Sequence, residues 1–150
     1  MVEISTIGYG GKKPHEFFDE LDRLNADLII DVRWNPFKAF LGVYTYTSLI
    51  KRVKNYHWIP ELGNPSQKLP PKLIDEKLGL AKVIALINQH KAKRVVLLCA
   101  EKDEEKCHRK YIKEKLLKRL KIVETLSEKK VVRNAPKKGK EIRDGDKFVV

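Results

Sequence analysis

The feature that most constrains the fold of this chain is a regular alternation between two kinds of apolar pattern. Short runs of apolar residues, several of them partly β-branched, predict strands at residues 2–7, 27–32, 56–59, 94–99 and 121–126. Segments with apolar residues at helical spacing predict helices at residues 14–25, 47–55 and 73–89, and from 102 or 103 to about 120. Repeated strand–helix–strand units favour a mostly parallel sheet covered on both faces. We therefore expect a single Rossmann-like three-layer α/β domain with about five strands.

The chain length and the composition of its last part suggest how this domain is organised. The 150 residues suffice for one domain with a sizeable core. We expect the α/β core at residues 1–126 and a basic extension of the same domain at residues 127–150. In this extension, Val131-Val132 and residues 147–150 resemble short strands, and Asp144-Gly145 is a hairpin turn signal. The extension is therefore predicted to be a small β appendage.

The charge of the chain favours anionic partners. Lys and Arg total 32 against 20 acidic residues, which gives a net charge of +12. Such a surplus is typical of proteins that bind nucleic acid or phosphate-bearing small molecules. No apolar run approaches the roughly 20 residues of a membrane span, and the N-terminus has no secretory pattern. Two cysteines are too few for a secreted disulfide scaffold, so we expect a cytoplasmic protein with no membrane partner.

Both cysteines lie in one cluster of reactive residue types at positions 99 to 109. Cys99 ends a predicted strand, and ligands of open parallel sheets bind outside the carboxyl ends of strands. If Asp103 caps the next helix, Cys107 lies just past its first turn, with His108 and Arg109 beside it. A helix N-terminus and neighbouring cations lower the pKa of a thiol and favour attack by the thiolate.

Several interpretations of these thiols stay open. Cys107 or Cys99 can be a nucleophile, the two can form a redox or structural disulfide, or they can be a buried and inert pair. Together with His108 they can also bind a metal ion. Metal sites usually have a fourth ligand and closer paired spacing, so we expect no metal. The Cys-x₅-Arg loop of cysteine phosphatases is absent, because Glu105 and Lys113 stand at the arginine positions.

Polar residues also follow the first three predicted strands. After the first, Gly8-Tyr9-Gly10-Gly11 can cradle an anion with its backbone amides or simply form a tight turn. Its spacing matches neither a dinucleotide fingerprint nor a Walker loop, so we expect no cofactor. After the second, Asp31 and Arg33 share a face and can form an internal ion pair, or Arg33 can bind a phosphate. After the third, Glu61 can act as a general base or be a solvated loop residue.

Five short motifs in this chain resemble those of the family called domain of unknown function 488. The motifs are Thr-Ile-Gly-Tyr-Gly at 6–10, Asp-Val-Arg at 31–33, Pro-Glu-Leu-Gly at 60–63, Leu-Leu-Cys-Ala-Glu at 97–101 and Cys-His-Arg at 107–109. Their order and spacing resemble the family over residues 3–126. The resemblance implies a single Rossmann-like α/β domain whose motifs converge on one pocket, and it implies no particular reaction.

Two functional hypotheses from different classes follow. The first is a cysteine-dependent transferase or hydrolase that acts on a phosphate-bearing substrate, a nucleotide or nucleic acid. In it, Cys107 or Cys99 is the nucleophile, assisted by His108, and Glu101 or Glu61 is the acid or base. The anion would be held by Arg33, Arg109 and the amides of Gly8, Tyr9 and Gly10, near Asp31. The alternative is a non-catalytic nucleic-acid-binding module that uses the basic surface and four aromatic residues, Trp34, Phe37, Tyr44 and Tyr46.

Overall fold

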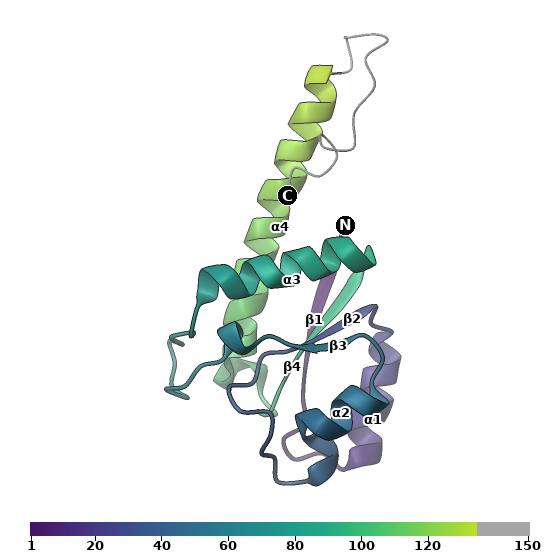
Figure 1. Cartoon of the computed structure of the whole chain (residues 1–150), viewed down its shortest axis with the longest axis vertical. Coiled ribbons are helices and arrows are strands. Elements are labelled where there is room, and N and C mark those ends of the chain that lie inside the picture. Colours follow the sequence, from purple (N-terminus) through teal and green to yellow (C-terminus); the bar gives the residue numbers. More distant parts are fainter. Residues whose placement is uncertain (135–150) are drawn as a thin grey trace.

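The protein is built around one wholly parallel sheet (Figure 1). A computed structural model describes residues 1–134, with side chains up to residue 122. Within this part of the chain the sheet has four strands in the order β1-β4-β2-β3. The strands are β1 (Glu3–Gly8), β2 (Leu28–Asp31), β3 (Tyr56–Trp58) and β4 (Arg94–Cys99). The predicted α/β class is confirmed, with four strands in place of about five.

Helices connect the strands and follow the last of them. They are α1 (Pro14–Leu24), α2 (Tyr46–Arg52), α3 (Glu76–His90) and α4 (His108–Asn134), with short 3₁₀ turns η1 (Gly42–Tyr44), η2 (Pro60–Leu62) and η3 (Glu104–Lys106). Pro14 opens α1, where the missing N–H of proline costs no hydrogen bond. Asp75 caps α3 by accepting the backbone N–H of Leu78. In the described residues, no helix has the length and apolar character needed to span a membrane.

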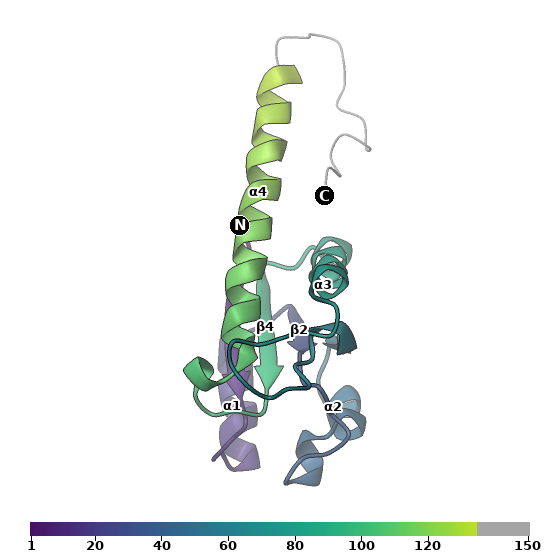
Figure 2. The same cartoon turned by 90° about the vertical axis from the view of Figure 1, so that its left-hand side faces the viewer.

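The predicted fifth strand is wrong, because residues 121–126 are part of α4. The same helix also includes Val131-Val132, which the sequence had suggested as a short strand. Positions 112, 116, 120 and 123 are apolar and keep helical spacing, and neither Gly nor Pro interrupts the segment. A helix satisfies its own backbone hydrogen bonds and needs no neighbouring strand. Figures 1 and 2 show α4 continuing well beyond the sheet. The predicted Asp144-Gly145 turn and residues 147–150 lie outside the described residues.

Two apolar cores lie on the two faces of the sheet. Leu28 and Ile30 point to one face and pack with residues of α3 and α4. Ile29, between them, points to the other face and packs with residues of α1 and α2. Because side chains alternate along a strand, the continuous apolar runs of the sequence supply both cores.

The connections between strands locate a crevice at the carboxyl end of β4. The chain leaves β1 and β2 for helices on the α1 and α2 face, and it leaves β4 for α4 on the opposite face. In the sheet, β4 lies between β1 and β2. Neighbouring strands whose chains leave in opposite directions open a crevice beyond their carboxyl ends, where ligands of such sheets bind. Cys99, the last residue of β4, lies at this crevice.

Candidate functional site

A cavity of about 500 Å³ lies at this crevice. Four separate segments supply its lining, from the loop after β1 and from residues 33–38, 64–69 and 99–108. Of the residues singled out in the sequence, the lining includes Tyr9, Arg33, Cys99, Glu101, Cys107 and His108. The lining does not include Gly8, Gly10, Asp31, Glu61 or Arg109. The structure therefore brings six of the eleven predicted site residues together at the cavity and leaves the other five outside its lining.

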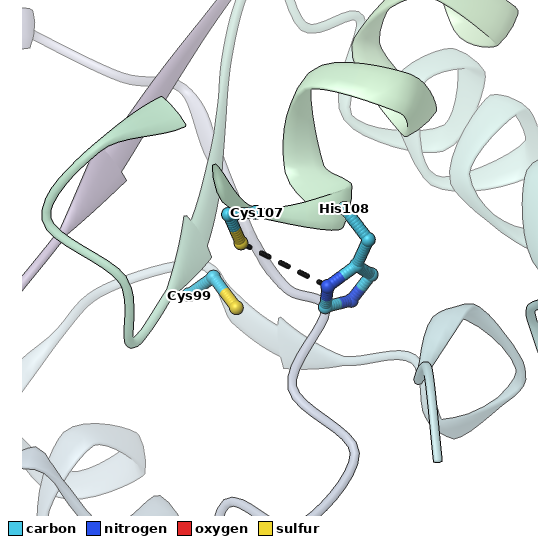
Figure 3. Close-up of side chains that lie close together, drawn as sticks. All are labelled: Cys99, Cys107 and His108. Atoms are coloured by element: carbon cyan, nitrogen blue, oxygen red, sulfur yellow. Dashed lines mark hydrogen bonds between the residues drawn. The ribbon is translucent and has the colours of Figure 1, made fainter. Parts of the chain in front are cut away.

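The two thiols and the imidazole form a compact cluster on one wall of the cavity (Figure 3). The sulfurs of Cys99 and Cys107 and a ring nitrogen of His108 all lie within 4.8 Å of one another. Cys107 Sγ is 3.8 Å from His108 Nδ1. All three residues are buried, and both cysteines are free thiols. The two cysteines are therefore not joined by a disulfide in this structure.

A single backbone contact fixes the orientation and tautomer of His108. Its Nε2 lies 2.7 Å from the carbonyl oxygen of Val32, the residue after β2. Because a carbonyl oxygen can only accept a hydrogen bond, Nε2 carries the hydrogen. In the neutral ring, Nδ1 then has a free lone pair, and this lone pair faces Cys107 Sγ. His108 can therefore accept a proton from the Cys107 thiol, and the resulting imidazolium can pair with the thiolate.

Cys107 lies closer to a helix N-terminus than the sequence suggested. Asp103 caps η3 by accepting the backbone N–H of Glu105, and it does not cap α4. Cys107 has an extended backbone and immediately precedes His108, the first residue of α4. Because the partial positive charge of a helix is concentrated in its first turn, this position stabilises a thiolate better than one past that turn.

The environment separates the acidities of the two thiols. The pKa of Cys107 lies well below its usual range, chiefly because the Cys99 thiol donates a hydrogen bond to its sulfur. Burial acts in the opposite direction, while His108 and the backbone N–H of Arg109 add to the lowering. The pKa of Cys99 is raised, because its proton is held by Cys107 and because the thiol is buried. The pair therefore favours a thiolate at Cys107 and a thiol at Cys99.

Arg33 forms an internal ion pair, one of the two roles that the sequence left open. Its Nε and Nη2 donate to the Asp31 carboxylate, with an Nη2–Oδ2 distance of 2.7 Å. Nη1 donates to the carbonyl oxygen of Tyr44 and, at 3.3 Å, to the hydroxyl of Tyr9. The hydroxyl of Tyr56 donates to the same carboxylate. Of the five guanidinium hydrogens, these contacts use four and leave one on Nη2.

The glycine loop after β1 serves close packing. A Cβ on Gly8 would lie 1.7 Å from the carbonyl oxygen of Glu101, and one on Gly10 would lie 2.8 Å from that of Ala100. The Gly10 amide donates to the carbonyl oxygen of Ala100. The Tyr9 amide nitrogen lies 3.4 Å from the carbonyl oxygen of Cys99. These amides are engaged by the neighbouring loop, so the tight-turn interpretation fits them better than an anion cradle.

Arg109 and Glu61 lie outside the cavity lining and have partners elsewhere. The Arg109 guanidinium is buried and donates to the carbonyl oxygens of Glu101 and Lys102, which fixes the loop after β4. Glu61 pairs with Lys82 of α3 at 2.7 Å, and this hydrogen bond is the main reason that its pKa is lowered. Glu101 is the only one of the two predicted acid or base carboxylates that lines the cavity.

Two lysines of the lining were not singled out in the sequence. Lys38 and Lys106 are both exposed residues that line the cavity. In a chain with 32 basic residues, neither lysine is distinguished by its position. Lys106 lies next to Cys107, and that proximity is the one signal that could have identified it.

The fold and the site define an α/β protein with a dithiol–imidazole cluster at the carboxyl edge of its sheet. The chain belongs to the family described as Domain of unknown function DUF488, whose family model matches residues 13–116. This range includes every predicted site residue except Gly8, Tyr9 and Gly10. No curated protein and no solved structure matched the chain.

Proposed function

We propose that the protein is a cysteine-dependent transferase or hydrolase that acts on an anionic, phosphate-bearing substrate. The observation that carries the proposal is the contact between Cys107 Sγ and His108 Nδ1 in the wall of a cavity of about 500 Å³. A nucleophilic thiol beside a base, with the base oriented by a third group, is the arrangement found in covalent catalysis. Here the orienting group is the carbonyl oxygen of Val32.

In the proposed reaction, the thiolate of Cys107 attacks the electrophilic atom of the substrate. A bond forms between Sγ and that atom, and the bond to the leaving group breaks with its electron pair going to the leaving group. The proton that His108 accepted from the Cys107 thiol neutralises the leaving group, and Glu101, in the cavity lining, is the second candidate acid. Water or an acceptor molecule then attacks the same atom and loses its proton to His108 Nδ1, and the bond to Sγ breaks with its electron pair returning to sulfur, which restores the thiolate.

The cations of the cavity support an anionic substrate. Lys38 and Lys106 line it, and Arg33 keeps one N–H for a ligand. The lining carries one carboxylate, Glu101, against these three cations, and a cleft with such a surplus of positive charge raises the local concentration of anions. Trp34, which is 46% exposed, also lines the cavity and offers an apolar surface to the uncharged part of a substrate.

The test compares alkylation by iodoacetate, which is anionic, with alkylation by iodoacetamide, which is neutral. With its pKa lowered to about 4, Cys107 should react about tenfold faster than an ordinary thiol at pH 5, since an ordinary thiol is almost entirely un-ionised there. At this pH the gain in thiolate outweighs the lower nucleophilicity of a more acidic thiol. We also expect the iodoacetate-to-iodoacetamide rate ratio at Cys107 to fall about tenfold in the double variant Lys38→Gln and Lys106→Gln. Peptide mass spectrometry assigns the modified cysteine.

The matched control removes the same charge far from the cavity. Lys54→Gln together with Lys93→Gln changes two exposed lysines that do not line the cavity. This variant should keep the wild-type rate ratio. An ordinary alkylation rate at Cys107 would contradict the thiol-enzyme proposal. An equal loss of the ratio in both double variants would show that net charge, and not the cavity, attracts the anion.

A second candidate function is nucleic-acid binding, which the exposed aromatic residues favour. Trp34 and Phe37 are 46% and 53% exposed, as a base-stacking surface requires. Tyr44 cannot contribute, because it is buried and stacks on Tyr9. A binding module without catalysis would bind oligonucleotides with a steep salt dependence, and Cys107→Ser would leave that affinity unchanged.

A further inference from the structure

The cluster of Cys99, Cys107 and His108 has a second chemical property that nucleophilic catalysis does not use. Two sulfurs and one imidazole nitrogen are the ligand types that Zn²⁺ prefers. We propose that these three residues form a binding site for a thiophilic divalent cation such as Zn²⁺, with the fourth coordination position open to the cavity.

The spacing of the three ligand atoms fits a tetrahedral ion. Zinc–sulfur bonds of about 2.3 Å and zinc–nitrogen bonds of about 2.0 Å imply a sulfur–nitrogen separation of about 3.6 Å and a sulfur–sulfur separation of about 3.8 Å. Cys107 Sγ and His108 Nδ1 are 3.8 Å apart. Since no pair in the cluster exceeds 4.8 Å, each needs to close by at most about 1 Å. Side-chain rotation can provide such a shift.

The partner of His108 is the one that a metal-bound histidine needs. A ligating imidazole usually donates its other ring N–H to a carbonyl or carboxylate, which fixes the ring and its tautomer. Nε2 of His108 lies 2.7 Å from the carbonyl oxygen of Val32, and Nδ1 faces the sulfurs. The ring is therefore already oriented for ligation through Nδ1.

The surroundings of the cluster supply rigidity and an open position. Cys99 ends the buried strand β4, and Cys107 and His108 stand at the start of α4, so two packed elements hold the ligands. The cavity borders all three residues and admits water or another small ligand to the ion. The sequence argument against a metal rested on a missing fourth ligand and on the absence of closely paired ligands. Sites with three protein ligands complete their coordination with water, and the fold brings the three ligand atoms within 4.8 Å of one another. Two thiolates also neutralise the charge of a divalent ion.

Cation binding and nucleophilic attack exclude each other at this site. A bound ion occupies the lone pairs of Cys107 Sγ and His108 Nδ1, the two atoms that the proposed reaction uses. A bound ion therefore protects both cysteines from alkylation. The cation site requires only the geometry of the cluster, and it does not depend on the proposed enzymatic function.

The first experiment titrates Co²⁺, a spectroscopic substitute for Zn²⁺, into the reduced, metal-free full-length protein without oxygen. We expect one Co²⁺ per chain, with sulfur-to-cobalt charge-transfer bands in the near ultraviolet and the visible bands of tetrahedral cobalt. Added Zn²⁺ should abolish these bands by displacement. Absence of the charge-transfer bands in the wild-type protein would overturn the proposal.

Variants then assign the ligands. Cys99→Ser, Cys107→Ser and His108→Asn should each weaken Zn²⁺ binding by more than the roughly 10–100-fold that loss of an outer-shell partner costs. His15→Asn, at an exposed histidine of α1, is the matched control and should bind like the wild type. If Cys99→Ser with Cys107→Ser retains wild-type affinity for Zn²⁺, the ion lies elsewhere. If a variant fails to fold, the Co²⁺ spectrum of the wild-type protein still tests whether the cation site exists.

Alkylation with and without Zn²⁺ separates the two proposals. Fast alkylation of Cys107 that saturating Zn²⁺ does not slow would contradict the cation site and leave the thiol-enzyme proposal standing. Slow alkylation of Cys107 in metal-free protein, together with a positive Co²⁺ titration, would contradict the thiol enzyme and support the cation site.

Discussion

At the scale of single residues, the site depends on buried polar groups that distant segments hold in place. Asp31 is fully buried and accepts hydrogen bonds from Arg33 and from the hydroxyl of Tyr56. The sequence places Asp31 and Arg33 on one face but leaves their role open, because Tyr9, Tyr44 and Tyr56 determine it from other parts of the fold. The motif could thus be found from the sequence, whereas its use as an ion pair could not.

The substitution Asp31→Asn should destabilise the protein by about 3–5 kcal/mol, because it leaves the buried Arg33 guanidinium without a counter-charge. Urea unfolding followed by circular dichroism measures this loss in the free energy of unfolding. The control is Glu105→Gln, which breaks the exposed ion pair with Lys110 and should cost less than about 1 kcal/mol. Equal losses in the two variants would mean that burial of the Asp31–Arg33 pair does not matter.

At the scale of elements, the close approach of two loops positions the thiols. The loop after β1 packs against residues 100–102, and a Cβ on Gly8 would overlap the carbonyl oxygen of Glu101. That carbonyl also accepts Nη1 of Arg109 at 2.7 Å. The loop that joins Cys99 to Cys107 is therefore fixed from both sides.

The substitution Gly8→Ala should push the loop at residues 100–102 away from β1. We expect it to lower the free energy of unfolding by about 3 kcal/mol, the upper end of the range typical of overpacking. Because this loop joins Cys99 to Cys107, its displacement should separate the two thiols, and alkylation of Cys107 should slow in the folded variant. Gly42→Ala is the matched control, since its Cβ would meet no atom within 4 Å. A Gly8→Ala protein with wild-type stability and alkylation rate would show that the close packing of the loops is not required.

The element scale also shows where sequence reasoning succeeds and where it fails. Each of the four observed strands was predicted within one or two residues, because buried parallel strands produce unbroken apolar runs. The same reasoning misassigned residues 121–126, since a β-branched stretch in a helix resembles a short buried strand when its neighbours are unknown. The sequence predicted a helix beginning at residue 102 or 103, but an intervening 3₁₀ turn, η3, shifts the helix start to His108.

At the scale of the whole molecule, the cavity exists only when the fold brings four segments together. The order of the sheet places β4 between β1 and β2, and this order cannot be deduced from the strand pattern alone. The sequence nevertheless indicated that polar groups after the strands meet at one edge, because all strands of a parallel sheet end on the same side. The topology decides which of them meet: the thiols and His108 lie together in the cavity wall, and Glu61 pairs with α3 outside it.

If the whole fold sets the acidity of Cys107, its selective reactivity must disappear when the protein unfolds. In the folded protein we expect Cys107 to react faster than Cys99, whose pKa is raised. In concentrated urea both are ordinary cysteines with a pKa of about 8.5, and the ratio of their alkylation rates should approach about one. Short alkylation pulses at increasing urea concentration, with peptide mass spectrometry, give this ratio. Its midpoint should coincide with that of the circular dichroism signal, as expected for a two-state domain. A ratio that stays high in urea would instead assign the reactivity to the adjacent Cys107-His108 sequence.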